Sequence, residues 1–148
     1  MELEGQQACP LFYTEVTTGG SSYCFSAPDE KASWTEASMY CLISGGVLVV
    51  IDDSEMETAV RDFITSGGKR NSGYWTAGTD AFRDGDWQWE TNYGSSFEDF
   101  GYSNWAPLFP RRLEWTNCMY IDTAIGNMKW KDASCNAQKR FVCMGNTR

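Results

Sequence analysis

The segment spanning residues 104–118, NWAPLFPRRLEWTNC, is dense in side chains suited to binding a ligand. Leu108, Phe109 and Trp115 offer apolar surface, and the Arg111-Arg112 pair offers two guanidinium groups. Aromatic and arginine side chains are enriched at the centres of protein interfaces. We therefore expect this segment to contact a ligand. The alternative is that Phe109 and Trp115 pack inward over the prolines, which would make the segment purely structural.

Catalytic chemistry is not expected. The chain contains no histidine, which excludes serine–histidine and cysteine–histidine nucleophile systems and histidine-ligated metal sites. Its 20 acidic residues could supply a carboxylate pair, but no pair has a distinguishing spacing. We predict that the protein is not an enzyme.

The charge balance narrows the class of partner. The net charge is −8 and the isoelectric point is about 4.4, whereas nucleic acids and anionic membranes attract basic surfaces. No apolar run reaches the length of a membrane-spanning helix, and the first residues lack the features of a signal peptide. We expect one domain over residues 9–144, without a nucleic-acid partner or membrane insertion in this segment. Residues 1–8 would be a tail, disordered or added in cloning, and residues 145–148 a second tail.

The cysteine content indicates an oxidising compartment. Six cysteines without a Cys-x-x-Cys pair favour disulfide bonds over zinc or redox chemistry. We expect an extracellular protein, either secreted or the ectodomain of a membrane protein. Reduced, buried thiols in a cytosolic protein are the alternative. Spacing alone does not choose among the possible pairings.

Two capping-box patterns mark the starts of two helices. Ser33 with Glu36 begins the first helix, and Ser54 with Glu57 begins the second. Apolar residues at helical spacing follow each pattern, and a glycine pair ends each helix. The expected buried faces are Trp34, Ala37, Met39 and Cys41 in the first helix and Met56, Val60, Phe63 and Ile64 in the second.

Strand patterns surround these helices. The predicted strands are 11–13, 21–26, 47–51, 74–79, 86–90, 117–122, 127–132 and 139–144. A long irregular region runs from residue 93 to about residue 115, which is typical of a functional loop. Helices early in the chain and an antiparallel sheet late in it predict an α+β fold in a single domain.

A series of short motifs, taken in order and spacing, resembles the C-type lectin-like domain. The motifs are YCF at 23–25, SWTEASMYC at 33–41, GGVLVVI at 45–51, YWTAGTD at 74–80, DGDWQWE at 84–90, YSNW at 102–105, WKDASC at 130–135 and RFVC at 140–143. No one of them is specific alone, but together they cover essentially all of residues 9–144. The resemblance implies two helices, antiparallel sheets and a long loop region.

The resemblance also implies a disulfide pairing and a role for four tryptophans. In the long, three-disulfide form of the family the implied pairs are Cys9–Cys24, Cys41–Cys143 and Cys118–Cys135. The tryptophans at structural positions of the fold are Trp75, Trp89, Trp105 and Trp130. We expect these four to pack in the core and not to stack on sugars.

Sugar-binding members of this family hold calcium on the long loop and the strand that follows it. Calcium takes about six to eight oxygen ligands. Counting from Trp105, the triplet that supplies two of them is Phe109-Pro110-Arg111 here, and an amide position is occupied by Lys131. Asp132 keeps its carboxylate, whereas Thr116 offers only a hydroxyl where a further acid is expected. We predict that this site does not hold calcium and that no cofactor is required.

The family also has an auxiliary calcium position, and calcium binding there stays open as an alternative. Our hypothesis is that Arg111 or Arg112 pairs with Asp80 or Asp84 and substitutes a guanidinium for the ion. A solvated turn at the two aspartates is one alternative, and a weak calcium site is the other. The candidate ligands of that weak site are Asp80, Asp84, Asn117 and Glu114.

Three functions are compatible with this sequence. The one we expect is calcium-independent recognition of a protein or a glycan, and its candidate ligand-binding residues are Phe109, Arg111, Arg112, Glu114, Trp115 and Lys131. The second is a calcium-dependent, carbohydrate-binding lectin with a displaced metal site, drawn from Glu98, Asp99, Glu114, Asp122 and Asp132. The third is an ice-binding or biomineral role, which relatives of this fold have, although the sequence shows no regular threonine or aspartate array.

Overall fold

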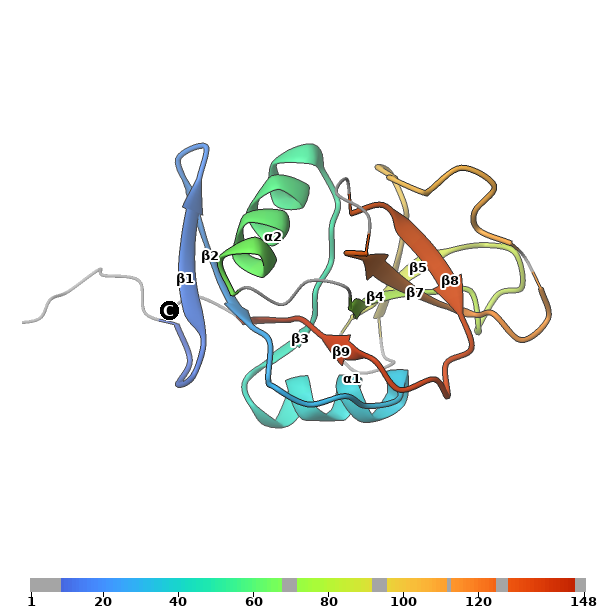
Figure 1. The fold of residues 1–148 in the computed structure, drawn as a ribbon, viewed down its shortest axis with the longest axis horizontal. Helices are drawn as coiled ribbons and strands as arrows, with labels where there is room; N and C mark the ends of the chain where they lie inside the picture. Colours follow the sequence, from blue (N-terminus) through green and yellow to red (C-terminus); the bar gives the residue numbers. More distant parts are fainter. Residues whose placement is uncertain (1–8, 68–71, 92–95, 112, 125–127, 146–148) are drawn as a thin grey trace, which may run out of the picture.

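A computed structural model describes residues 9–67, 72–91, 96–111, 113–124 and 128–145. It has the predicted α+β class, with two helices and two sheets (Figure 1). The helices are α1 (Trp34–Ile43) and α2 (Ser54–Ser66). The strands are β1 (Thr14–Thr18), β2 (Ser21–Ser26), β3 (Gly46–Leu48), β4 (Gly73–Thr79), β5 (Gln88–Thr91), β6 (Ser96–Asp99), β7 (Cys118–Asp122), β8 (Trp130–Ala133), β9 (Arg140–Phe141) and β10 (Cys143–Gly145). Neither of the described helices has the length and apolarity to cross a membrane.

The two sheets lie towards opposite ends of the molecule. A four-stranded sheet has the order β1-β2-β10-β3, so the last strand of the chain lies between strands of its first half. The second sheet has the order β6-β5-β4-β7-β8, and β9 pairs with β4 in parallel. Figure 1 shows α1 and α2 on opposite sides of the region between the sheets, and the long loops beyond the second sheet.

The helix starts confirm one predicted cap and correct the other. In α1 the Ser33 hydroxyl accepts from the Glu36 amide at 3.2 Å, and the Glu36 carboxylate accepts from the Ser33 amide at 3.0 Å. In α2 the cap is Asp53, whose Oδ1 accepts from the Met56 amide at 2.8 Å, so the predicted cap at Ser54 was wrong by one residue. Aspartate caps a helix as well as serine does, and Glu57 is thereby left for another role.

The buried helix faces follow the predicted periodicity with one exception. Trp34, Ala37 and Cys41 are buried in α1, but Met39 is exposed because it lies on another face of the helix. In α2 the apolar stripe is buried as expected, with Phe63 partly covered at its edge.

The strand boundaries differ from prediction at several points. The first hairpin begins at Thr14, so residues 11–13 lie before it. Residues 49–51 are buried but lie beyond the end of β3. Strand β6 falls inside the region predicted to be irregular, because its polar sequence SFED gives little signal for an edge strand that pairs only with β5. Strand β10 runs to Gly145, one residue past the expected domain end.

The three disulfides are the pairs that the family resemblance implied. Cys41–Cys143 joins α1 to β10, and Cys118–Cys135 joins the start of β7 to the segment after β8. Cys9–Cys24 ties the amino-terminal segment to β2. Each bridge therefore joins two segments that belong to different parts of the chain.

The predicted tryptophans form the centre of the second sheet's core. Trp75, Trp89 and Trp130 are fully buried, and Trp105 is partly buried against Trp130 at a ring separation of 5.9 Å. The Trp130 indole N–H donates to Glu57 Oε1 at 3.1 Å. Glu57 thus binds a core tryptophan and does not take part in the helix cap, which Asp53 provides. The expectation of core packing is confirmed.

The disulfides should differ in their contribution to stability because they close loops of different length. The Cys41–Cys143 bridge joins residues that are 102 positions apart, and the Cys9–Cys24 bridge joins residues that are 15 positions apart. Replacing either pair by alanine releases the corresponding loop. We expect losses in the free energy of unfolding of about 4–5 and about 3 kcal/mol respectively. Guanidinium unfolding of the two double variants measures the difference. A larger loss for the Cys9–Cys24 variant would contradict the assignment of the long bridge as the main constraint.

A buried glutamate in β5 should make stability depend on pH. Burial raises the pKa of Glu90 to about 7 from an ordinary value of 4.5. Between these values the folded state retains a proton that the unfolded state has lost, so stability falls as pH rises through this window and then levels off. We expect Glu90→Gln to match the wild type near pH 4.5 and to exceed its free energy of unfolding by about 1–3 kcal/mol at pH 8. Urea unfolding of both proteins across this range measures the difference, and a pH-independent difference would contradict this role.

Candidate functional site

The long loop is attached to the sheet at β8. The Trp130 amide donates to the Asn104 carbonyl at 3.0 Å, and the Ala106 amide donates to the Trp130 carbonyl at 2.9 Å. The Lys129 ammonium also donates to Asn104 Oδ1 at 2.8 Å. This confirms the expected anchor at residues 104–105, and it fixes where the following turn projects from the sheet.

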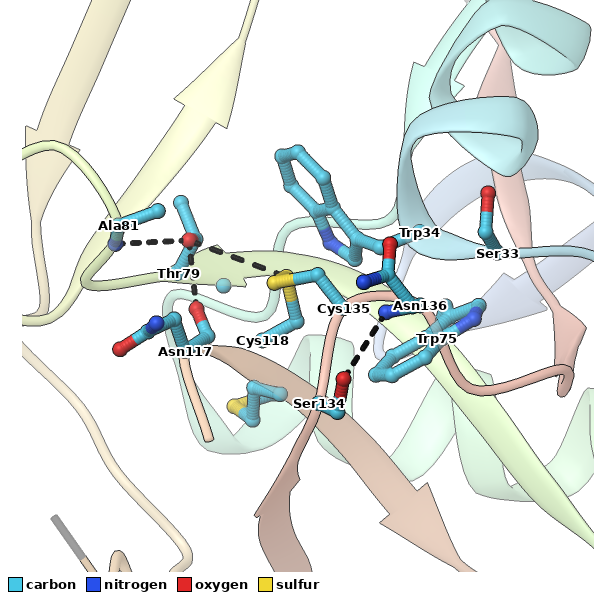
Figure 2. Close-up of a disulfide and its surroundings, with 12 residues drawn as sticks. Ser33, Trp34, Trp75, Thr79, Ala81, Asn117, Cys118, Ser134, Cys135 and Asn136 are labelled. Carbon is cyan, nitrogen blue, oxygen red and sulfur yellow. Dashed lines mark hydrogen bonds between the residues drawn. A yellow bond between two sulfur atoms is a disulfide. The ribbon is translucent and has the colours of Figure 1, made fainter. Parts of the chain in front are cut away.

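The far end of the loop is held at the Cys118–Cys135 bridge. Figure 2 shows Thr79, from β4, between this disulfide and Asn117. The Thr79 hydroxyl donates to the Asn117 carbonyl at 2.6 Å and accepts from the Ala81 amide at 3.0 Å. The Asp80 amide donates to the same Asn117 carbonyl at 3.1 Å. Both ends of the loop are therefore fixed to the second sheet.

Two cations flank the ring of Phe109 in the middle of the loop. The Arg111 guanidinium carbon lies 5.6 Å from the ring centroid, and the Lys131 ammonium lies 5.3 Å from it. Both distances fall within the range of cation–π attraction. Lys131 also forms an ion pair with Asp122 at 2.7 Å, and this hydrogen bond raises the pKa of Lys131. The structure thus brings three of the predicted ligand-binding residues together.

The surviving acid of the calcium motif is engaged by Arg111. Asp132 is only 1% exposed, and its Oδ1 accepts from the Arg111 amide at 2.9 Å. The Arg111 guanidinium donates to the Asp132 carbonyl at 3.3 Å, and its Nε lies 3.8 Å from Oδ1. Arg111 therefore pairs with Asp132 and not with Asp80 or Asp84, whereas the same hypothesis for Arg112 lies outside the described residues. The nearer partner is on β8, because the turn after Pro110 directs the backbone of Arg111 towards that strand.

The predicted auxiliary position is only partly assembled. Asp80 is buried, and its Oδ2 accepts from the Gly85 amide at 3.1 Å, whereas Asp84 is exposed. Burial raises the pKa of Asp80, the bond from Gly85 opposes this, and the charges of Asp84 and Asp132 add to the rise. Asn117 uses its amide N–H to donate to the Glu114 carbonyl at 3.0 Å. Within the part of the chain that the structure describes, no three acidic, cysteine or histidine side chains form a group that could hold a metal.

The residues at the family's main calcium site do not fit calcium. Phe109, Arg111 and Lys131 offer no side-chain oxygen, and Asp132 accepts from Arg111. The Thr116 hydroxyl is used within the loop, since it donates to the Leu113 carbonyl and accepts from the Leu113 amide, each at 3.2 Å. Calcium needs several oxygen ligands at once, so this arrangement cannot supply its coordination shell.

The loop presents apolar and charged side chains to solvent. Leu108 is 94% exposed and Trp115 is 63% exposed, and Glu114 is exposed beside Trp115. Phe109 is partly covered, so the inward-packing alternative holds only in part for Phe109 and not for Trp115. Arg112, also predicted to bind ligand, lies outside the described residues.

The acids suggested for a displaced calcium site have separate environments. Glu98 and Asp99 are exposed on β6, and Asp99 accepts from the Gln88 side chain at 3.1 Å. Asp122 is paired with Lys131.

Sequence reasoning missed Tyr120 and Lys139, which lie on the same side of the sheet as Lys131. The Lys139 ammonium lies 4.0 Å from the centroid of the Tyr120 ring. The alternation within β7 could have indicated that Tyr120 faces outward. Lys139 precedes β9, and no local pattern of the sequence reveals which strand it covers.

Comparison with known proteins places this arrangement in a family. The model of the lectin C-type domain matches residues 30–145. A perlucin-like protein of Mytilus galloprovincialis is 35% identical over 136 residues, which cover 91% of this chain and 81% of that relative. Lithostathine-1 of Mus musculus is 30% identical, with coverage of 92% and 78%.

Two solved structures show the same fold. Human lithostathine superposes with a TM-score of 0.79 at 24% identity, and the match covers 99% of this chain and 96% of that one. A calcium-independent type II antifreeze protein superposes with a TM-score of 0.78 at 23% identity, covering 99% of this chain and 100% of that one. The predicted fold is confirmed by both.

The contact between Arg111 and Asp132 should contribute to stability. Arg111→Ala removes the guanidinium beside the buried carboxylate of Asp132 and keeps the hydrogen bond from the amide of residue 111. We therefore expect a loss of about 1–2 kcal/mol in the free energy of unfolding. Adding Asp132→Asn to this variant should recover part of the loss, because an amide carries no charge to compensate. Urea unfolding of the single and double variants measures both effects.

Arg83→Ala is the matched control for this experiment. The Arg83 side chain is 67% exposed and pairs with the exposed Asp86, so we expect a change within about 0.5 kcal/mol. An equal loss of unfolding free energy in the Arg83 and Arg111 variants would show that the contact of Arg111 with Asp132 contributes no more than an exposed ion pair.

Proposed function

The chain belongs to the lectin C-type domain family, and from this premise we propose that it is a non-catalytic extracellular recognition module. It would be secreted or part of an ectodomain, and it would bind a protein or a glycan without calcium at the family's main site. Members of this family are generally not enzymes, and the absence of histidine from the whole chain agrees with this.

The observation that carries the proposal is the state of Asp132. In this chain the carboxylate is buried and accepts from the Arg111 amide, while the guanidinium of the same residue lies beside it. A positive charge attached to the chain thus stands beside the one acid that the motif retains. A free calcium ion approaching this point would meet the charges of Arg111 and Lys131 and find few oxygen ligands.

The proposed contact surface is the exposed part of the loop, which we call the loop face. It consists of Leu108, Phe109, Arg111, Glu114 and Trp115. Large exposed apolar side chains beside a guanidinium have the composition of an interface centre. Fixed attachment at Trp130 and at Cys118 reduces the entropy that the loop would lose on binding.

A second candidate is calcium-dependent recognition through the auxiliary position. One observation favours it: Asp80 Oδ1 and Asp132 Oδ2 are buried and have no hydrogen-bond partner among the described residues. Buried carboxylate oxygens are normally satisfied by a donor, an ordered water molecule or a cation. Two such oxygens are too few to bind calcium tightly without further ligands.

Calcium titration distinguishes the two candidates. We expect calorimetry to detect no binding tighter than about 1 mM, a value typical of weak extracellular sites. We also expect about 5 mM calcium to leave the melting temperature unchanged, whereas a micromolar site would stabilise the fold by about 5 kcal/mol at that concentration. Asp80→Asn is the control variant. Micromolar binding in the wild type that is lost in Asp80→Asn would replace the first candidate by the second.

A further inference from the structure

The outer face of the second sheet carries a continuous row of side chains next to the loop face. Residues directly opposite in neighbouring strands share a face, and the register pairs Trp75 with Tyr120 and Tyr120 with Lys131. Asp122 lies two residues from Tyr120 in β7 and therefore points to the same side. Asp132 and Trp130 alternate with Lys131 and point to the opposite side, where both are buried.

Cations and aromatic rings alternate along this face. Lys131 lies between the ring of Phe109, at 5.3 Å, and the carboxylate of Asp122, at 2.7 Å. Lys139 lies over Tyr120 at 4.0 Å and over the buried ring of Trp75 at 5.7 Å. Arg111 continues the row beyond Phe109. We call the row formed by Arg111, Phe109, Lys131, Tyr120 and Lys139 the basic strip.

Gly73 shows how closely this row is packed on the sheet. A Cβ atom at Gly73 would lie 2.8 Å from Cδ2 of Tyr120 and 3.3 Å from Cδ of Lys139. The missing side chain leaves room for the Tyr120 ring and the Lys139 stem to approach β4 closely. The strip therefore has a defined shape and is not a set of independent surface lysines.

The local charge of the strip is opposite to that of the whole molecule. The chain has a net charge of −8, but the strip has three cations, and the acids paired with them are Asp122 and the buried Asp132. Burial lowers the pKa of Lys139. The charge of Asp122 raises this pKa, and the charge of Lys31 lowers it further. The Arg111 side chain is 46% exposed and the Lys131 side chain 24%, which leaves both within reach of a ligand.

We propose that the basic strip binds an anionic polysaccharide, with its acidic groups on the cations and its sugar rings against Phe109 and Tyr120. This rests on the proposed calcium-independent recognition and names its ligand class. Several cations in a row favour a ligand with repeated negative charges, and the partly exposed rings of Phe109 and Tyr120 offer apolar contact to its sugar rings. The acidity of the rest of the surface disfavours a bulky polyanion such as a nucleic-acid duplex.

The test measures polysaccharide binding to the whole chain in the presence of a chelator. Dextran sulfate, hyaluronan and neutral dextran are immobilised, and the protein is passed over them in EDTA at low ionic strength. We expect binding to dextran sulfate or hyaluronan, no binding to neutral dextran, and weaker binding as salt screens the charges. Comparison of the two anionic chains shows whether sulfate or carboxylate is the preferred group.

Matched substitutions locate the binding to the strip. We expect Lys131→Gln and Lys139→Gln each to weaken binding about threefold or more, and the double variant about tenfold. Arg83→Gln removes one exposed cation outside the strip and should change the affinity less than about twofold. The double arginine variant, Lys131→Arg with Lys139→Arg, keeps the charges and should retain binding. Melting curves confirm that each variant is folded.

Three results would overturn the proposal: equal binding to neutral dextran, no effect of the lysine substitutions in folded protein, or tighter binding to single-stranded DNA than to dextran sulfate. The calcium titration is a separate measurement. Micromolar calcium binding together with strip-dependent binding in EDTA would refute only the proposed calcium independence of the domain. Absence of polysaccharide binding with no calcium site would refute only the basic strip.

Discussion

The packing and hydrogen bonds of Trp130 connect most parts of the functional region. Its fully buried ring contacts Trp89, Phe100 and Trp105, and its indole N–H donates to Glu57 on α2. Its main chain simultaneously donates to and accepts from the long loop. A single residue of β8 thus links helix, sheet core and loop. The loop can lack secondary structure of its own because these main-chain bonds satisfy it at the point of attachment.

The alternation of β8 then divides the residues at the position of the family's calcium motif between two faces. Trp130 and Asp132 point into the protein, whereas Lys131 points to the outer face. An acid on the inner face needs a buried partner, and the backbone turn after Pro110 supplies Arg111. The cation on the outer face needs only partial compensation, which Asp122 supplies. The alternation of side chains along β8 thus places Asp132 inside the protein beside Arg111 and places Lys131 on the solvent side.

Most of the fold and part of the site could be predicted from the sequence. Helix caps, apolar stripes and the disulfide pairs rest on local patterns or on family motifs, and among these the cap at Ser54 and the exposure of Met39 were misplaced. Strand β6 was missed and several strand ends differ, because short edge strands give weak sequence patterns. The partner of Arg111 could not be predicted, because it depends on how the loop crosses β8 and not on spacing along the chain. Lys139 was missed for the same reason, since it reaches Tyr120 across β4, a strand that is distant from both in sequence.

Under the proposed calcium-independent recognition, a guanidinium beside Asp132 would give binding a different physical basis from a coordinated ion. A coordinated calcium ion binds sugar hydroxyls through short, directional contacts, and its effect disappears when a chelator removes it. Arg111 is covalently part of the loop, so its charge is always present beside Asp132 and orders the loop without an external ion. Attraction by Arg111 and Lys131 acts over longer distances and is screened by salt, which favours charged ligands over neutral ones. The side chains that offer no oxygen ligand, Arg111 on the loop and Lys131 on β8, are thus the same ones that present cations to solvent.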